Sequence, residues 1–253
     1  MQLERLLNVL EMTAVAGRPI SVAQLQKATG LPRPTCYRLV QTLIDHRLLD
    51  IPGDNGREYV IGERLIKLAL LGKSDIDVRK ATAAKIRQAA IHLGHACFLA
   101  RLRNNTVEII HVEVPEDATR SFVHPGLGQR PLHACSSAKV IAAFADDGLQ
   151  DDILQSGMDQ FNNNTHENFE SLAEEFKTIR ECGYAQCKQE ISLGISSIAA
   201  PVIFGGLGPT FSVGTVAHAS EFTDSNCPSI GTYLVELAET VSAAIQLCNV
   251  GEI

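Results

Sequence analysis

The sequence lacks the features that would place the protein in a membrane or outside the cell. None of its apolar runs reaches the roughly 18 residues that a membrane-spanning helix needs. The first residues include Glu4 and Glu11 and show neither the basic start nor the cleavage site of a signal peptide. The seven cysteines include no C-x-x-C pair, so we expect free thiols rather than disulfides or zinc ligands. These absences together predict a cytoplasmic protein.

What is present is an ordinary globular composition with unevenly distributed charge. Of the 253 residues, 45% are hydrophobic and 20% are charged, which suits one large or two smaller packed domains. The net charge of −7 argues against a nucleic-acid partner. However, residues 1–73 carry 10 Lys+Arg and 7 Asp+Glu, giving +3, whereas residues 74–253 carry 12 and 22, giving −10. A mildly basic segment therefore precedes an acidic one, which the total conceals.

The first 46 residues have the pattern of three helices. Apolar residues recur at helical spacing over the first 14 residues. Ser21 and Gln24 then form a capping box at the start of a short helix, which Gly30 can terminate. A third helix is expected to begin after Pro32 and to run to about His46. Two short helices joined by a glycine-containing turn predict a helix-turn-helix.

The third helix has one face that suits packing and another that suits DNA. At about 100° per residue, its apolar side chains fall on one side. The other side offers a guanidinium, an amide, a phenol and a hydroxyl, which match base edges and phosphates in a major groove. A strand-turn-strand pattern over 48–61 follows, as in a wing. The predicted DNA-contacting residues are Arg33, Pro34, Thr35, Tyr37, Arg38, Gln41 and, near the wing tip, Arg57; a merely solvated helix face is the alternative.

The rest of the chain predicts a linker helix and an α+β domain. Residues 63–72 place their apolar side chains on one side of a helix, which suits either an intramolecular core or a dimer seam. From residue 75 onward, helical and strand patterns alternate without regular βαβ repetition, which favours an α+β fold. The expected helices are 76–93, 136–144, 168–181 and 230–245, and the expected strands are 96–101, 106–114, 198–204 and 211–218.

Four stretches of the sequence match motifs of one family of bacterial regulators. They are the helix-turn-helix segment 31–43, the wing and linker segment 59–65, the segment Pro-Leu-His-Ala-Cys-Ser-Ser-Ala-Lys at 131–139, and the segment 180–201, which ends in Gly-Ile-Ser-Ser-Ile-Ala-Ala-Pro. On these residues the whole chain resembles the IclR family of transcriptional regulators. The resemblance implies a winged helix-turn-helix domain over 1–62, a linker helix over 63–74, and a GAF-like effector-binding domain over 75–253.

The resemblance also implies partners and a ligand site. It implies a homodimer, often paired into a tetramer, that binds operator DNA and responds to a small metabolite by changing operator occupancy or RNA polymerase recruitment. The family includes repressors and activators. By position, the effector-binding residues are Ser136, Ser137, Cys187, Ser197, Thr215 and Ala217. The family often has an acid where Cys187 stands, and the loop at 205–208 leaves the register around Thr215 open by one residue.

The chemistry of these residues favours an anionic effector and no catalysis. Serine and threonine hydroxyls donate and accept hydrogen bonds, and the free N–H groups at the start of the helix over 136–144 attract a carboxylate. Ser136 and Lys139 match the S-x-x-K motif of penicillin-recognising enzymes, but the companion S-D-N and K-T-G motifs do not occur. The histidines and cysteines show no metal-ligand spacing, and no cofactor motif is found.

We therefore expect a ligand-responsive transcriptional regulator that is not an enzyme and has no metal or cofactor. Two other functions remain open from the sequence. One is an enzyme that acts on a small acid or amide and carries an appended DNA-binding domain. The other is an adaptor that uses its winged domain to dock on a protein.

Overall fold

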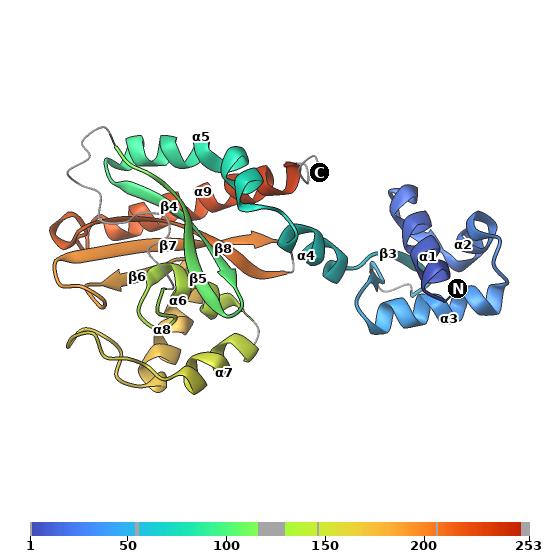
Figure 1. The fold of residues 1–253 in the computed structure, drawn as a ribbon, viewed down its shortest axis with the longest axis horizontal. Coiled ribbons are helices and arrows are strands. Elements are labelled where there is room, and N and C mark those ends of the chain that lie inside the picture. The colour runs from blue at the N-terminus through green and yellow to red at the C-terminus, as the bar shows by residue number, and fades with distance from the viewer. Residues whose placement is uncertain (1, 54–55, 116–129, 146, 206, 249–253) are drawn as a thin grey trace. The chain divides into compact units, whose positions relative to one another are not determined.

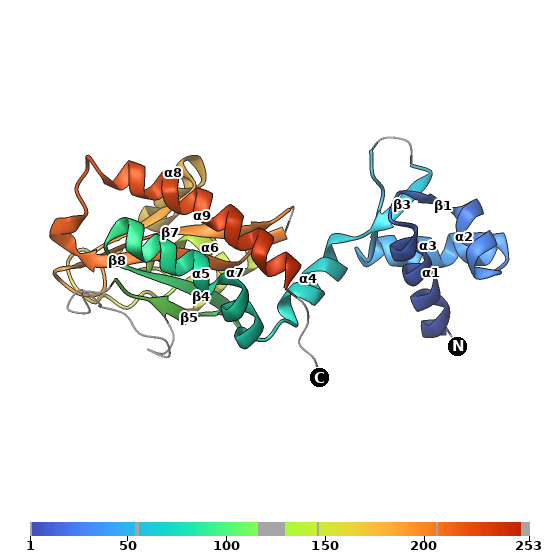
Figure 2. The same cartoon turned by 90° about the horizontal axis from the view of Figure 1, so that it is seen from above.

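The computed structural model describes residues 2–53, 56–115, 130–145, 147–205 and 207–248. The chain divides into two compact units, an N-terminal unit (Met1–Gly72) and a C-terminal unit (Lys73–Ile253), each of which is described by itself (Figures 1 and 2). Within the described residues, we find no helix whose length and apolar character would let it cross a lipid bilayer.

The N-terminal unit is a small helical bundle with a three-stranded sheet. Its elements are α1 (Gln2–Ala16), β1 (Ile20–Ser21), α2 (Val22–Thr29), α3 (Arg33–Asp45), β2 (Leu49–Asp50), β3 (Glu58–Ile61) and α4 (Glu63–Leu71). The strands pair antiparallel in the order β1-β3-β2. The predicted hairpin of 48–61 is thus confirmed, and β1 adds an unpredicted edge to it; residues 54–55 of its turn lie outside the described part.

Local capping sets the helix boundaries of this unit. The Oε1 atom of Gln24 accepts from the backbone N–H of Ser21 at 2.9 Å, and the hydroxyl of Ser21 accepts from the backbone of Gln24 at 3.4 Å, so the predicted capping box is confirmed. Gly30 ends α2 in the left-handed conformation at φ 69°. One apolar core lies beneath α1, α2, α3 and the sheet and includes Val9, Leu25, Leu39, Leu43 and Leu49.

The C-terminal unit is a five-stranded sheet covered on both faces. The strands are β4 (Ala96–Arg103), β5 (Thr106–Glu113), β6 (Ala185–Lys188), β7 (Ile195–Phe204) and β8 (Leu207–His218). They are antiparallel to their neighbours in the order β5-β4-β8-β7-β6. The helices are α5 (Asp75–Leu93), α6 (Ser136–Phe144), α7 (Asp147–Ser156), α8 (Phe169–Cys182) and α9 (Cys227–Leu247), with the short 3-10 helix η2 (Ala219–Glu221) before α9.

The helices form two layers with the sheet between them. Helices α5 and α9 cover one face, and α6 covers the other, with α7 and α8 packed against α6 (Figures 1 and 2). The predicted α+β class is confirmed. Strand β6 and helix α7 were not predicted, and β7 begins three residues earlier than expected, at Ile195.

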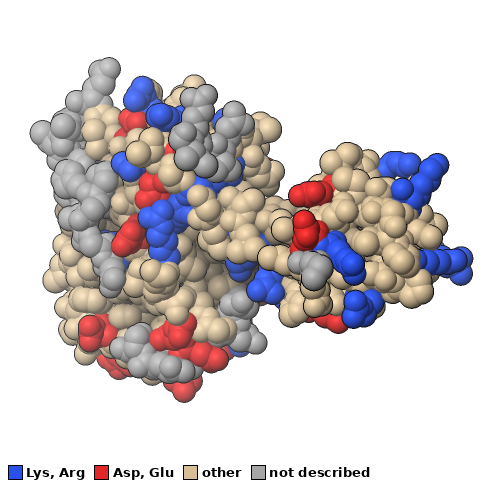
Figure 3. Space-filling model, turned by 45° about the vertical axis from the view of Figure 1, so that its right-hand side comes forward, with Lys and Arg blue, Asp and Glu red and all other residues tan. Residues whose placement is uncertain are grey.

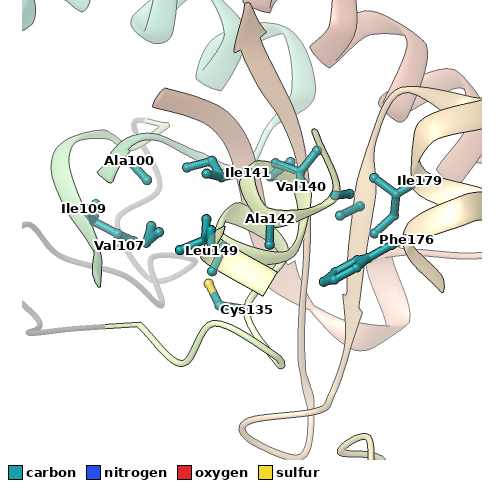
Figure 4. Close-up of a cluster of buried hydrophobic side chains, with 14 of the residues drawn as sticks. Ala100, Val107, Ile109, Cys135, Val140, Ile141, Ala142, Leu149, Phe176 and Ile179 are labelled. Carbon is teal, nitrogen blue, oxygen red and sulfur yellow. The ribbon is translucent and has the colours of Figure 1, made fainter. Parts of the chain in front are cut away.

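Helix α6 lies at the centre of the larger core. Every described side chain from Ser136 to Ala143 is buried, so this helix has no solvated face. Figure 4 shows Val140, Ile141 and Ala142 between Ala100, Val107 and Ile109 on one side and Phe176 and Ile179 on the other. Each fully buried aliphatic side chain contributes about 2 kcal/mol. The start of α6 is therefore held inside the unit.

Candidate nucleic-acid and effector sites

The structure places the predicted DNA-contacting residues on the exposed face of α3. Its apolar side is buried against α1 and α2. The guanidinium of Arg33 lies over the ring of Tyr37, 5.7 Å from the ring centroid, and its Nη2 donates to the phenol at 3.5 Å. Gln41 donates to Asp45 at 2.8 Å. The exposed residues are Arg33, Pro34, Tyr37, Arg38 and Gln41, and Thr35 is half-buried.

Other basic side chains of the N-terminal unit also face solvent. Arg57 is exposed and lies directly before the returning strand β3. Sequence reasoning did not single out five further exposed cations, namely Arg5, Arg18, Lys27, Arg47 and Arg64. Figure 3 shows Lys and Arg side chains on the visible surface of this unit, with a few acidic ones among them. The unit thus presents positive groups to solvent around the helix that offers polar side chains.

Four of the six predicted effector-binding residues come together at the start of α6. The hydroxyls of Ser136 and Ser197 are 2.7 Å apart. Ser197 on β7 pairs in register with Cys187 on β6, so their side chains share the sheet face that α6 covers. Ser137 follows on α6, with its hydroxyl 3.0 Å from the sulfur of Cys135. Residues on α6 and on strands β6 and β7, 50 to 61 positions apart in the chain, therefore form one polar group, in which Ser197 is half-buried.

The start of α6 is electrostatically open to an anion. Its N-cap residue, Cys135, makes no capping hydrogen bond through its side chain in the described structure. The first N–H groups of a helix carry the positive end of its dipole, and without a side-chain cap they attract a negatively charged group. The paired hydroxyls of Ser136 and Ser197 lie at this end and are able to donate to the same ligand.

The structure does not bring Thr215 and Ala217 to this group. Thr215 pairs with Cys97 and Ile198 across the sheet, and its hydroxyl donates to the carbonyl of Ala96 at 3.1 Å. Side chains alternate along a strand, so Thr215 and Ala217 face α5 and α9. The sequence left the register around Thr215 open by one residue, and a shift of one residue in a strand reverses the face on which each side chain lies. The neighbours on the α6 side are Gly214 and Val216, and sequence reasoning missed both, together with Cys135.

Cys187 contributes a neutral thiol to the site. Its side chain is buried, and burial, together with the nearby Glu190 and Cys135, raises the pKa of the thiol to about 12. It therefore carries no charge at neutral pH. An acidic side chain at position 187 would repel an anionic ligand, whereas the neutral thiol does not. The electrostatic potential at the site is therefore more favourable for a carboxylate than it would be with an acid at this position.

Comparison with known proteins now assigns the chain. The model of the bacterial transcriptional regulator IclR C-terminal domain matches residues 72–243, and the model of the IclR helix-turn-helix domain matches residues 2–50. The chain belongs to the IclR family. It is thus a DNA-binding transcriptional regulator with an effector-binding domain, as the four sequence motifs predicted.

Individual relatives of this IclR-family regulator are distant. The HTH-type transcriptional regulator XynR of Escherichia coli is 25% identical over 201 residues, 79% of each chain. The repressor AllR of the same species is 25% identical over 248 residues, 97% of this chain and 90% of the relative. Among solved structures, a putative IclR regulator from Silicibacter has a TM-score of 0.66 at 17% identity, with 97% and 96% of the two chains covered. An IclR homolog from Microbacterium hydrocarbonoxydans, complexed with 4-hydroxybenzoate, has a TM-score of 0.61 at 21% identity, with 97% and 99% covered. These structures share the fold.

Lys139 of this IclR-family chain is held by two carboxylates rather than by Ser136. Its ammonium group is fully buried and donates to both oxygens of Glu175 at 2.8 and 3.0 Å and of Glu190 at 2.7 and 2.9 Å. Burial opposes the charge, but the two carboxylates outweigh it and raise the pKa of Lys139. A lysine that stays protonated cannot act as the base for the serine three residues before it. The geometry therefore offers no support for acyl transfer at the S-x-x-K sequence.

Proposed function

We propose that the protein controls metabolic genes by binding operator DNA and that a small organic acid, bound at the start of α6, changes this binding. The observation that carries the proposal is the juxtaposition of Ser136 and Ser197 at an uncapped helix start inside the C-terminal unit. It supports an anion-binding site in an effector-binding domain, which in this family is joined to a DNA-binding domain. The proposal places the protein in the cytoplasm, with DNA and metabolite as its partners.

The DNA-binding half of the proposal rests on α3. Each protomer would set the Arg33–Gln41 face into a major groove, with Arg38 at a base edge or phosphate and Arg57 of the wing at the backbone. A homodimer, or a dimer of dimers, would read two half-sites separated by whole helical turns. Because phosphate contacts release counterions, we expect affinity to fall steeply with salt. If the protein acts as an activator, it would do so by contacting RNA polymerase.

The effector half of the proposal rests on the chemistry of the α6 site. One solved relative is complexed with 4-hydroxybenzoate, which is a carboxylate, and relatives include regulators of glycerol operons. The uncapped helix start and the neutral Cys187 favour a carboxylate over a cation. A regulator is supported over an enzyme because Lys139 is committed to two carboxylates, which leaves Ser136 without a base at that position.

The first residues of the C-terminal unit, Lys73 to Asp75, offer a path by which a conformational change at the effector site would reach the linker helix α4. Lys73 donates to the carbonyls of Gln246 and Cys248, so it covers the end of α9. Asp75 accepts from the buried Arg101 on β4 at 2.8 Å and from Arg103 at 2.7 and 2.8 Å. A ligand changes DNA affinity only if it binds two conformations differently. Because Lys73 and Asp75 are bonded to α9 and β4, a shift of the sheet would move these residues, which directly follow α4.

Two measurements test the proposal together. A mobility-shift titration with DNA upstream of the encoding gene should give a specific complex that weakens as salt rises. A thermal-shift screen of small carboxylates, with the matching alcohols or amides as controls, should then identify acids that stabilise the protein and change that complex. Binding to no upstream or intergenic DNA, with or without the acids, would overturn the regulator. Stabilisation by the neutral analogues alone would overturn the anionic effector.

A further inference from the structure

A cavity of about 150 Å³ lies between the edge strand β6 and the start of α9. Strands β6 and β7 form one side of it, and the segment from η2 to the first residue of α9 forms the other. Its lining includes Lys188, Ser196, Phe222, Asp224 and Cys227. None of these five residues was predicted to bind the effector, so the cavity has no part in the function proposed above.

The cavity lies on the opposite face of the sheet from the start of α6. Side chains alternate along a strand, and the hydroxyl of Ser197 meets Ser136 on the α6 face. Its neighbour Ser196 therefore faces α9, as does Lys188, which pairs with Ser196 in register. Cys187 and Ser197 also border the cavity, but with their backbone, because their side chains point toward α6. One sheet thus separates the cavity from the effector site.

The side chain of Ser196 is buried and has no hydrogen-bond partner. Only 7% of this residue is exposed, and its hydroxyl makes no hydrogen bond to any residue that the structure describes. By contrast, the buried hydroxyls of Ser212 and Ser242 donate to carbonyl groups at 3.3 and 2.7 Å. A buried polar group without a partner is costly. The hydroxyl of Ser196 is therefore placed to bind a polar group inside the cavity.

Two side chains of opposite charge line the same cavity. Lys188 and Asp224 are both exposed at its rim. Burial raises the pKa of the Cys227 thiol, Lys188 lowers it and Asp224 raises it, so both charges lie near this sulfur. In the described part of the chain neither forms an ion pair, with the other or with a third residue. An ammonium group and a carboxylate that share a cavity without pairing suit a ligand that carries both charges.

The start of α9 adds little to the recognition of charge. The first residue of the helix, Cys227, donates its N–H to the carbonyl of Thr223 at 3.0 Å, and Pro228 has no N–H to offer. The raised pKa keeps the Cys227 thiol neutral near pH 7. Recognition of a charged ligand therefore depends on Lys188 and Asp224.

The volume of the cavity and its apolar surface limit the ligand. A cavity of about 150 Å³ accommodates a molecule such as benzene, so this one suits about six to eight non-hydrogen atoms. The ring of Phe222 and the side chain of Ile198 supply apolar surface beside the polar groups. A short apolar or hydroxylated side chain would fit against them.

We propose that this cavity is a second ligand site, which binds a small zwitterion of the α-amino acid class. Lys188 and the hydroxyl of Ser196 bind its carboxylate, and Asp224 binds its ammonium group. Its side chain lies against Phe222 and Ile198. Alanine, serine and threonine have the required size. The proposal rests neither on the effector at α6 nor on DNA binding.

Calorimetric titration of the full-length chain measures the binding. L-Serine should bind with a Kd below about 1 mM. Two analogues separate the charges, because 3-hydroxypropionate lacks the ammonium group and ethanolamine lacks the carboxylate. All three are also titrated into the Ser197→Leu chain, in which the α6 site is blocked, and there each analogue should bind at least about tenfold more weakly than serine. An analogue as tight as serine would overturn the zwitterion, and no saturable binding of alanine, serine or threonine would overturn the site.

Two adjacent serines on opposite faces of β7 locate the binding. Ser196→Ala removes the hydroxyl that faces the cavity and should weaken the binding of L-serine about fivefold. Ser197→Ala removes a hydroxyl from the α6 face of the same strand and should leave the Kd within about twofold of wild type. The reverse order of effects would place the amino acid at the start of α6 and overturn the proposal.

Exchange of the two charged side chains tests their roles. Lys188→Met and Asp224→Asn should each weaken the binding of L-serine at least about tenfold. Both residues are exposed, so neither change should alter the Tm without ligand. The controls are Lys177→Met and Glu239→Gln, which change exposed charges on α8 and α9. Normal binding by Asp224→Asn would mean a site for an anion alone and would overturn the zwitterion. Because no DNA is used and the α6 site is tested separately, failure here is distinguishable from failure of the regulator function.

Discussion

The C-terminal unit buries some of its basic side chains, whereas the described arginines of the N-terminal unit are exposed. In the N-terminal unit Arg33, Arg38 and Arg57 are exposed, and the apolar core beneath them holds the fold. In the C-terminal unit Arg101 and Lys139 are almost completely buried and connect strands, helices and loops through carboxylates. A cation on the surface is available to a polyanion, whereas a buried cation is committed to its partners. Net charge therefore says little about binding until each charge is placed.

The acidic excess of the C-terminal unit has a related meaning. Acidic side chains gather along the edge formed by α7, α8 and their connecting segment, seen at the bottom of Figure 3. Part of the acidic content, such as Glu175 and Glu190, holds Lys139 inside the unit. Many of the remaining acidic side chains that the structure describes are exposed, where their negative charge disfavours phosphate contact. The following predictions test whether DNA contact is restricted to the N-terminal unit.

The largest effect should come from removing the buried cation of the C-terminal unit. Lys139→Met leaves Glu175 and Glu190 facing each other without their shared partner, and breaking a buried pair costs about 3–5 kcal/mol. The control is Lys177→Met, which removes an exposed partner of Glu174 and should cost less than about 0.5 kcal/mol. Urea unfolding gives both values. A Lys139→Met protein as stable as the control would show that burial does not distinguish the two cations.

A second, smaller loss of stability should come from changing Asp75, at the start of the C-terminal unit. Asp75→Asn weakens the hold on Arg101 and Arg103, and we expect a loss of about 2 kcal/mol at pH 7 because Asp75 is partly exposed. Burial opposes its charge, but the hydrogen bonds from both arginines outweigh it and lower the pKa of Asp75. The stability that a lowered carboxyl pKa provides is complete above the unfolded value, about 3.9, and is lost as the pH falls through the folded one.

The pH dependence separates this pair from a packing effect. The stability difference between wild type and Asp75→Asn should be constant from about pH 7 to pH 5 and should shrink below about pH 4. Asp224→Asn, which changes an exposed carboxylate, is the matched control. A difference that persists unchanged at pH 3 would contradict the ion-pair explanation.

Local signals explain why the N-terminal unit was predictable. The capping residues Ser21 and Gln24, the terminating Gly30 and the two faces of α3 all act within a few residues, so spacing alone places them. The strand β1 was missed because two residues, Ile20 and Ser21, carry no periodicity. Its pairing with β3 is a tertiary contact.

Non-local contacts explain what the sequence left unpredicted in the C-terminal unit. Strand β6 reads Ala-Gln-Cys-Lys, which has weak strand propensity, and it exists because β7 pairs with it. The face on which Thr215 lies could not be predicted because the register was open by one residue, and a shift of one residue in a strand reverses every side chain. Lys139 pairs with Glu175 and Glu190, which follow it by 36 and 51 residues in the sequence. No local sequence motif therefore predicts the cluster.

A third prediction concerns the effector site. Ser197→Leu places a bulky apolar group against Ser136 and should weaken the response to an identified carboxylate at least about 20-fold, or about 1.8 kcal/mol. Operator affinity without ligand should be unchanged, which also shows that the protein folds. Ser229→Leu on the exposed side of α9 is the control. An unchanged dose–response in a mobility-shift titration would refute the assignment of Ser197 to the site.

The smallest effect, and the most direct test of the contrast between the units, compares two exposed cations. Arg38→Ala and Lys177→Ala remove the same charge from the surface of the N-terminal and C-terminal units. Loss of a base or phosphate contact should lower operator affinity about tenfold in Arg38→Ala, or about 1.4 kcal/mol, with unfolding unchanged. Lys177→Ala should leave affinity within about twofold. Equal losses in the two variants would mean that overall charge, rather than the face of α3, governs DNA binding; no loss in Arg38→Ala would show that another face of the N-terminal unit meets the DNA.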